Sequence, residues 1–124
     1  MKYFLFTILM FSLSCCSQNN RLVLGKKHAQ EELNLALSKN TQDNLVNNNT
    51  ILIKDSTTAI KVAEPILFSI YSKENIIKQR PYETYLIDNY WVISGTLPQE
   101  YKGGTFLIII DARNSQVIKI IHSK

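Results

Sequence analysis

Between residues 81 and 121, apolar residues either alternate with polar ones or gather in short runs. These runs are rich in β-branched and aromatic residues and are separated by turn-forming residues, which is typical of strands joined as an antiparallel meander. Asp88 and Asn89 separate the first two runs, and because both tolerate positive φ they predict a two-residue hairpin turn. The predicted strands cover residues 81–87, 90–97, 104–110 and 117–121.

The run from Phe106 to Ile110 is apolar at every position, so both faces of this third strand are apolar. A strand of this kind is usually central in its sheet and covered on both sides. In the strand before it, Trp91, Ile93 and Leu97 share one face by alternation. We therefore expect Trp91 to be buried between the sheet and a helix.

A helix is predicted at about residues 57–71, because one side of it would form a wide apolar stripe. The residues of this stripe are Ala59, Ile60, Ala63, Ile66, Leu67 and Ile70. Asp55 supplies a side-chain oxygen that favours a helix start. Residues 72–75 predict a turn, residues 76–77 a short apolar clamp, and residues 78–80 an exposed approach to the first strand. The whole pattern predicts an α+β fold in which a helix packs on a curved antiparallel four-stranded meander.

The first thirteen residues hold one lysine followed by an apolar run. The run is too short to span a bilayer and fits the apolar core of an export signal. Small residues then precede Cys15 and Cys16, which resembles a bacterial lipobox, where a diacylglycerol is attached to the cysteine that becomes the first mature residue. Either cysteine fits this pattern. The alternatives are a free thiol, plain secretion, and a cytoplasmic or uncleaved segment. Residues 1–15 are the predicted lipoprotein signal peptide.

Residues 16–50 are polar and rich in asparagine, which predicts a tether leading away from a membrane. One amphipathic helix is expected inside it, at residues 26–38, where Ala29, Leu33 and Leu37 are four residues apart. His28 lies on this helix and is expected to be solvated. The tether ends in Asn-rich residues, so residues 51–124 form the predicted α+β domain.

The formal net charge of +4 is spread thinly along the chain. Residues 55–124 hold eight Lys and Arg against seven Asp and Glu, and residues 16–54 hold five against three. Nucleic-acid binding needs lysines and arginines clustered on one face, and no such cluster is visible. Membrane contact is therefore expected through a lipid and not through a polybasic patch.

No catalytic, cofactor or metal site is predicted. The chain has two histidines, His28 and His122, and its acidic residues in the strand region are scattered, so the ligand set of a zinc site is not assembled. Tyrosines are numerous, and tyrosine is favoured at protein interfaces. Tyr90, at the hairpin, and Tyr101, in the loop before the third strand, are the candidate partner contacts.

Five stretches of the domain resemble a bacterial family: residues 58–67, 80–82, 89–98, 102–106 and 117–122. They are similar to immunity proteins of polymorphic toxin systems that have a nuclear-transport-factor-2-like, or cystatin-like, fold. The resemblance implies a non-enzymatic protein that binds and neutralises a cognate toxin, and no contact residue carries over from it. Ser115 departs from the pattern, because a glycine is expected in this last turn.

Two other classes stay open from the residues alone: a PepSY-like inhibitory or binding module of exported proteins, and a small enzyme with a pocket in its curved sheet. The strands offer few convergent polar groups, which disfavours the enzyme. The export signal and lipobox predict a lipoprotein anchored in the membrane and facing the periplasm, where an incoming toxin would be met. A toxin gene beside this one would favour the immunity function.

Overall fold

The computed structural model describes residues 21–38 and 44–123. These residues fall into two compact units that divide within residues 39–43. The first unit contains α1 (Gly25–Leu37), in which no side chain is buried. The second contains α2 (Ser56–Tyr71), α3 (Lys73–Ile77) and the strands β1 (Glu83–Ile87), β2 (Tyr90–Ser94), β3 (Phe106–Asp111) and β4 (Val117–His122).

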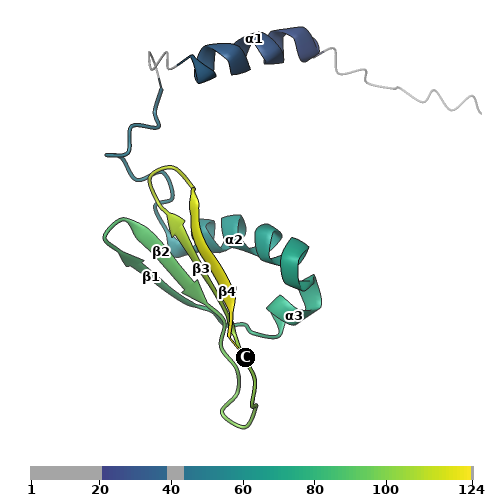
Figure 1. The fold of residues 1–124 in the computed structure, drawn as a ribbon, viewed down its shortest axis with the longest axis vertical. Helices are drawn as coiled ribbons and strands as arrows, with labels where there is room; N and C mark the ends of the chain where they lie inside the picture. The colour runs from purple at the N-terminus through teal and green to yellow at the C-terminus, as the bar shows by residue number, and fades with distance from the viewer. Residues whose placement is uncertain (1–20, 39–43, 124) are drawn as a thin grey trace, which may run out of the picture. The chain divides into compact units, whose positions relative to one another are not determined.

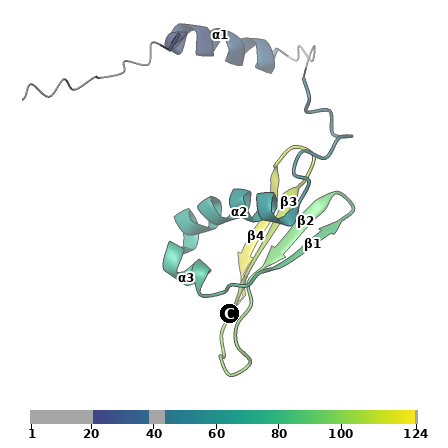
Figure 2. The same cartoon turned by 180° about the vertical axis from the view of Figure 1, so that it is seen from behind.

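The four strands form one antiparallel sheet in the order β1-β2-β3-β4, so each strand pairs with its neighbour in the chain. Figures 1 and 2 show α2 and α3 on one side of this sheet. The predicted α+β class and four-stranded meander are confirmed. The Asp88–Asn89 turn has φ of 45° and 68°. Positive φ at both central residues is what a two-residue type I′ hairpin turn requires.

The core lies between α2 and the sheet face that it covers. Ala59, Ala63 and Leu67 are buried on α2, and two of the three are alanines, which allows the helix to approach closely. Trp91 and Ile93 of β2 face them beside Ile110 and Ile108 of β3. The Trp91 side chain is 6% exposed, and its Nε1 donates a hydrogen bond of 2.9 Å to the carbonyl oxygen of Ile53. The predicted burial of Trp91 is confirmed.

α2 begins at a capped end and is tied to the sheet by a polar cluster. The Asp55 side chain accepts a hydrogen bond of 2.8 Å from the Thr58 amide, and this bond lowers the pKa of Asp55 below its ordinary value. Farther along, the Glu64 carboxylate accepts hydrogen bonds from the Tyr82 hydroxyl (2.8 Å) and from Arg80 Nε (3.0 Å). These bonds fix the helix relative to the start of β1.

Residues 51–53 form a lead-in to α2, in which the amides of Leu52 and Ile53 donate to the Ala112 carbonyl. A local expectation just after α2 is corrected by the structure. The predicted turn at residues 72–75 reduces to Ser72, with φ of 69°, because α3 begins immediately after it. Ser115 has φ of 64°. This left-handed conformation favours glycine, which explains why the family resemblance predicts a glycine at this position.

Candidate functional site

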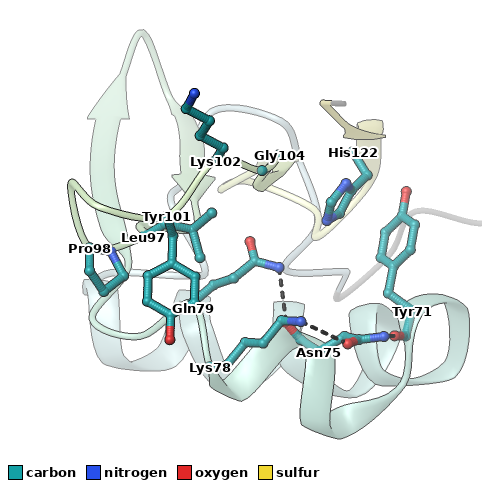
Figure 3. A pocket seen from close by; sticks show the side chains of 11 residues that line it. Tyr71, Asn75, Lys78, Gln79, Leu97, Pro98, Tyr101, Lys102, Gly104 and His122 are labelled. Atoms are coloured by element: carbon teal, nitrogen blue, oxygen red, sulfur yellow. Dashed lines mark hydrogen bonds between the residues drawn. The ribbon is translucent and has the colours of Figure 1, made fainter.

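A cleft of about 720 Å³ lies between the end of α2, α3, and the loop that joins β2 to β3 (Figure 3). We call it the α3 cleft. The loop projects past the end of the sheet in Figure 1, and β4 ends beside the cleft through His122. The lining residues are Tyr71, Asn75, Lys78, Gln79, Leu97, Pro98, Tyr101, Lys102, Gly103, Gly104 and His122.

Gln79 fixes the base of the α3 cleft and corrects the prediction that residues 78–80 are an exposed approach. Its side chain is 1% exposed, whereas Lys78 and Arg80 are exposed as predicted. Gln79 Nε2 donates to the Asn75 carbonyl at 2.9 Å, and Gln79 Oε1 accepts from the Phe106 amide at 2.9 Å. One amide side chain therefore joins α3 to the start of β3.

The walls of the α3 cleft are aromatic and basic. The rings of Tyr71 and His122 lie 5.3 Å apart between centroids. Lys78 Nζ donates to Asn75 Oδ1 at 3.1 Å, and Tyr101 is 69% exposed at the mouth of the cleft. Among the described residues, no carboxylate lines the cleft. Its local charge is therefore positive, although the domain as a whole is close to neutral.

The second candidate surface is the sheet face that α2 does not cover, which we call the open face. Near the Asp88–Asn89 turn it includes a shallow hollow of about 350 Å³. Strand alternation and register place eight apolar or aromatic side chains on this face: Tyr85, Ile87, Tyr90, Val92, Leu107, Ile109, Ile118 and Ile121.

The open face contradicts the prediction that the third strand is covered on both sides. Tyr85, Ile87 and Ile118 are 54%, 54% and 50% exposed, and Leu107 and Ile109 of β3 are only half-buried. The described residues of this unit cover one face of the sheet and leave the other to solvent. By the same register Glu83, Ser94 and Lys119 lie on this face among the apolar side chains. An exposed apolar surface with polar residues around it is typical of an interaction site.

Tyr90 lies at the end of the open face within a small polar cluster. Asp111 is 4% exposed and pairs with Arg113, whose Nη2 lies 2.8 Å from Asp111 Oδ2. Arg113 Nη2 also donates to the Tyr90 hydroxyl at 3.2 Å, and its guanidinium lies 5.5 Å from the centre of the Tyr90 ring. The hydrogen bonds from Arg113 hold the pKa of Asp111 below its usual range.

This pair predicts a pH dependence of folding. Because the pKa of Asp111 is lower in the folded protein than in the unfolded chain, the pair stabilises the fold above about pH 4. That stability is lost as the pH falls through the folded pKa of Asp111.

We expect Arg113→Met to lower the urea midpoint at pH 7, and we expect this difference from the wild type to shrink at pH 3. Lys102→Met, on the β2–β3 loop, is the control and should show little difference at either pH. An Arg113→Met difference that is equal at both pH values would contradict the account.

The structure places the two predicted partner contacts on separate surfaces. Tyr90 lies on the open face and is half-buried, whereas Tyr101 lies at the mouth of the α3 cleft. Cys15 and Cys16, the predicted lipid attachment sites, and the predicted signal peptide lie outside the described residues. The sequence analysis did not predict Lys78 and Gln79 as site residues. In the sequence they are only two polar residues that follow Ile76 and Ile77.

The chemistry available to the described residues is limited. No group of three or more His, Cys, Asp or Glu side chains comes together there in a way that could hold a metal ion. Of the four acidic residues in the strand region, Asp111 alone is buried, and its partner is Arg113. In the part of the chain that the structure describes, no helix is both long and apolar enough to cross a membrane.

Comparison with known proteins identifies two relatives of the chain. The chain is 34% identical over 73 residues to the uncharacterized protein YbbC of Escherichia coli (strain K12), which is 58% of this chain and 60% of YbbC. It is 26% identical over 120 residues to the uncharacterized protein YhhH of the same strain, covering 95% of this chain and 84% of YhhH. No solved structure matches the chain significantly.

The sequence profile of the family described as "NTF2 fold immunity protein" matches residues 58–124. The matched segment begins inside α2 and includes α3 and all four strands. It therefore contains both the α3 cleft and the open face. The match does not favour the PepSY-like alternative, and it confirms the family that the sequence resembles. The chain belongs to the family of immunity proteins with an NTF2 fold.

Proposed function

We propose that this immunity protein binds a cognate protein toxin and neutralises it by occlusion, without chemistry of its own. The observation that carries the proposal is the family match over residues 58–124, which spans most of the second unit. An immunity role implies a toxin as partner. Occlusion needs only a preformed surface that covers the toxin's working part, and a standard interface of this kind buries about 1,600 Å² in total.

The side chains of the second unit favour a non-enzymatic role. General acid–base catalysis needs a positioned group within hydrogen-bond reach of the reacting atom. In the α3 cleft, both ends of the Gln79 amide are already bonded to main-chain groups of the protein. On the open face the described side chains are mostly apolar. His122, the histidine of the cleft, bonds through Nδ1 to the Ser123 carbonyl, and no hydrogen bond joins it to a hydroxyl or carboxylate side chain among the described residues. Blocking is therefore the better-supported mechanism.

The open face is the surface best suited to the toxin. Apolar and aromatic side chains supply most of the binding energy at interfaces, and tyrosine and arginine are favoured there. The open face offers Tyr85 and Tyr90, with Arg113 at its end. Arg113 is already oriented by Asp111, so little side-chain freedom would be lost when a partner binds.

The proposal is tested by co-expression. The toxin domain encoded by the neighbouring gene is exported to the periplasm, with and without this protein. Cells that carry the protein should survive, because the bound toxin cannot reach its target. Equal death in the two cultures would reject the immunity role.

A matched pair of substitutions tests whether the open face is the contact. Ile118 on this face is 50% exposed, and Ile70 on α2 is 52% exposed. Because both are accessible in the free protein, replacing either with lysine should leave the fold intact. We expect Ile118→Lys to abolish most of the protection, since it places a charge in an apolar interface, and Ile70→Lys to preserve it. Equal survival with both variants would remove the open face from the proposal.

We further propose that the chain is exported and anchored through a lipid on Cys15 or Cys16. The support is the short apolar run and the small residues before these cysteines. A lipid tether would hold the protein on the periplasmic side, where an incoming toxin arrives. Intact-mass measurement of the membrane fraction should show a new N-terminal cysteine that carries a diacylglycerol. A cleaved but unmodified protein in the soluble fraction would contradict the anchor.

A further inference from the structure

We propose that the α3 cleft is a second binding site, which takes an acidic segment of a protein partner. The cleft lies inside the second unit and is not part of the open face. Its volume of about 720 Å³ is in the range of pockets that enclose a ligand or several side chains. Its charge, its polar groups and its apolar wall together determine the class of ligand.

The charge of the cleft is positive. Lys78, at the end of α3, and Lys102, on the β2–β3 loop, both line it. The acidic residues adjacent in sequence to lining residues, Glu74 and Glu100, are exposed and do not line it. Figure 3 shows Lys78 near Asn75 at the base of the cleft and Lys102 on the loop above, with the Lys102 side chain extending away from Lys78. An occupant with negative charge is therefore favoured.

The apolar part of the lining favours a peptide over a small anion as the ligand. Leu97 and Pro98 form an apolar stretch of the loop beside Tyr101. On the far side, Tyr71 and His122 pack against each other. A phosphate or a free carboxylate would leave these apolar surfaces unused, whereas a segment with acidic and apolar side chains would contact both kinds of surface. Two lysines are also too few for a nucleic-acid footprint, which needs a cluster of basic residues.

The base of the cleft is preformed. Gln79 is held at both ends by main-chain groups, and the Gly95 backbone lies directly against it. A rigid base reduces the conformational freedom that is lost on binding. If the partner is the toxin, the cleft is a second contact within the proposed function. The preference of the cleft for an acidic segment is argued from its own residues and does not require the partner to be the toxin.

The test uses the full chain and a capped pentapeptide of alternating glutamate and leucine. Binding is followed by the NMR shifts of the Gly103 and Gly104 amides, which lie in the cleft, with the buried Trp91 indole as an internal reference. We expect the two glycine amides to shift and saturate while the indole does not. A peptide of alternating lysine and leucine should cause no shift. The double variant Lys78→Glu/Lys102→Glu should weaken binding about tenfold.

Controls keep the test decisive. Lys54→Glu/Lys61→Glu makes the same change in net charge away from the cleft, and it should leave the affinity within about twofold of the wild type, since both lysines are exposed. Lys102→Glu alone, on an exposed loop, serves if the double variant fails to fold. The inference is overturned if the acidic peptide causes no shift. It is also overturned if the reversed and control variants bind alike, or if glutamate or inorganic phosphate alone binds as tightly as the peptide. The survival assay is independent of these results, so failure of the immunity role and failure of the cleft are told apart.

Discussion

Replacing Gly95 with alanine is expected to lower the free energy of unfolding by about 2–3 kcal/mol. A Cβ at this position would lie 2.2 Å from Gln79 Oε1 and 2.8 Å from Gln79 Cβ. Gln79 cannot move aside easily, because its amide bonds to both the Asn75 carbonyl and the Phe106 amide. The backbone at Gly95 is itself held, since its amide donates to the Phe106 carbonyl at 3.1 Å. Urea denaturation followed by circular dichroism measures the loss.

Two further variants identify the cause of that loss. Gly103→Ala is the matched control, because a Cβ there would meet Leu97 Cδ1 at an ordinary distance of 3.7 Å. We expect it to change stability by less than about 0.5 kcal/mol. In a Gln79→Ala background the collision with Gln79 Oε1 is removed and the 2.8 Å approach to Gln79 Cβ remains, so Gly95→Ala should cost less than it does in the wild type. A Gly95→Ala effect that is the same with and without the Gln79 side chain would refute the proposed contact.

Replacing Trp91 with alanine is expected to destabilise the fold by about 3–5 kcal/mol, as for other large truncations in a core. The side chain is 6% exposed and fills the space between β2 and the lead-in segment before α2. Its indole N–H also satisfies the Ile53 carbonyl, which would lose its partner in the variant. Thermal and urea denaturation should both show the change.

Trp91→Phe separates packing from hydrogen bonding. It retains most of the ring volume and loses the bond to the Ile53 carbonyl, so its cost should be about 1–2 kcal/mol. Tyr85→Ala is the exposed control on the open face, where the side chain is 54% exposed, and it should cost less than about 1 kcal/mol. If Trp91→Ala were no worse than Tyr85→Ala, Trp91 would not be a core residue.

The elements of this fold follow from short-range patterns in the sequence. Alternation identifies β2, and Trp91 and Ile93 prove to be the buried positions that it predicts. The Asp88–Asn89 pair identifies the first hairpin because both residues accept the positive φ that the turn requires. In α2, Ala59, Ala63 and Leu67 of the predicted apolar stripe are buried, whereas Ile70 at its end is 52% exposed. Each of these signals depends on residues within a few positions of one another.

The features that the sequence did not predict depend on residues distant in the chain. Gln79 is buried because its partners at Asn75 and Phe106 are brought to either end of its amide by the fold. A glutamine in a polar stretch carries no local sign of this role. The α3 cleft is likewise assembled from α2, α3, a loop and β4. The apolar outer face of β3 indicates that something covers it, but strand patterning does not say whether the cover belongs to the same chain.

The central claim is that this immunity protein binds and blocks a toxin, and purified components test it most directly. The toxin domain encoded by the neighbouring gene is titrated with the full chain, and both complex formation and toxin activity are measured. The account predicts a stoichiometric complex that forms below micromolar concentration, with toxin activity falling in proportion to the complex. It also predicts that Ile118→Lys weakens the complex while Ile70→Lys does not. No association at micromolar concentration, together with undiminished toxin activity, would contradict the account.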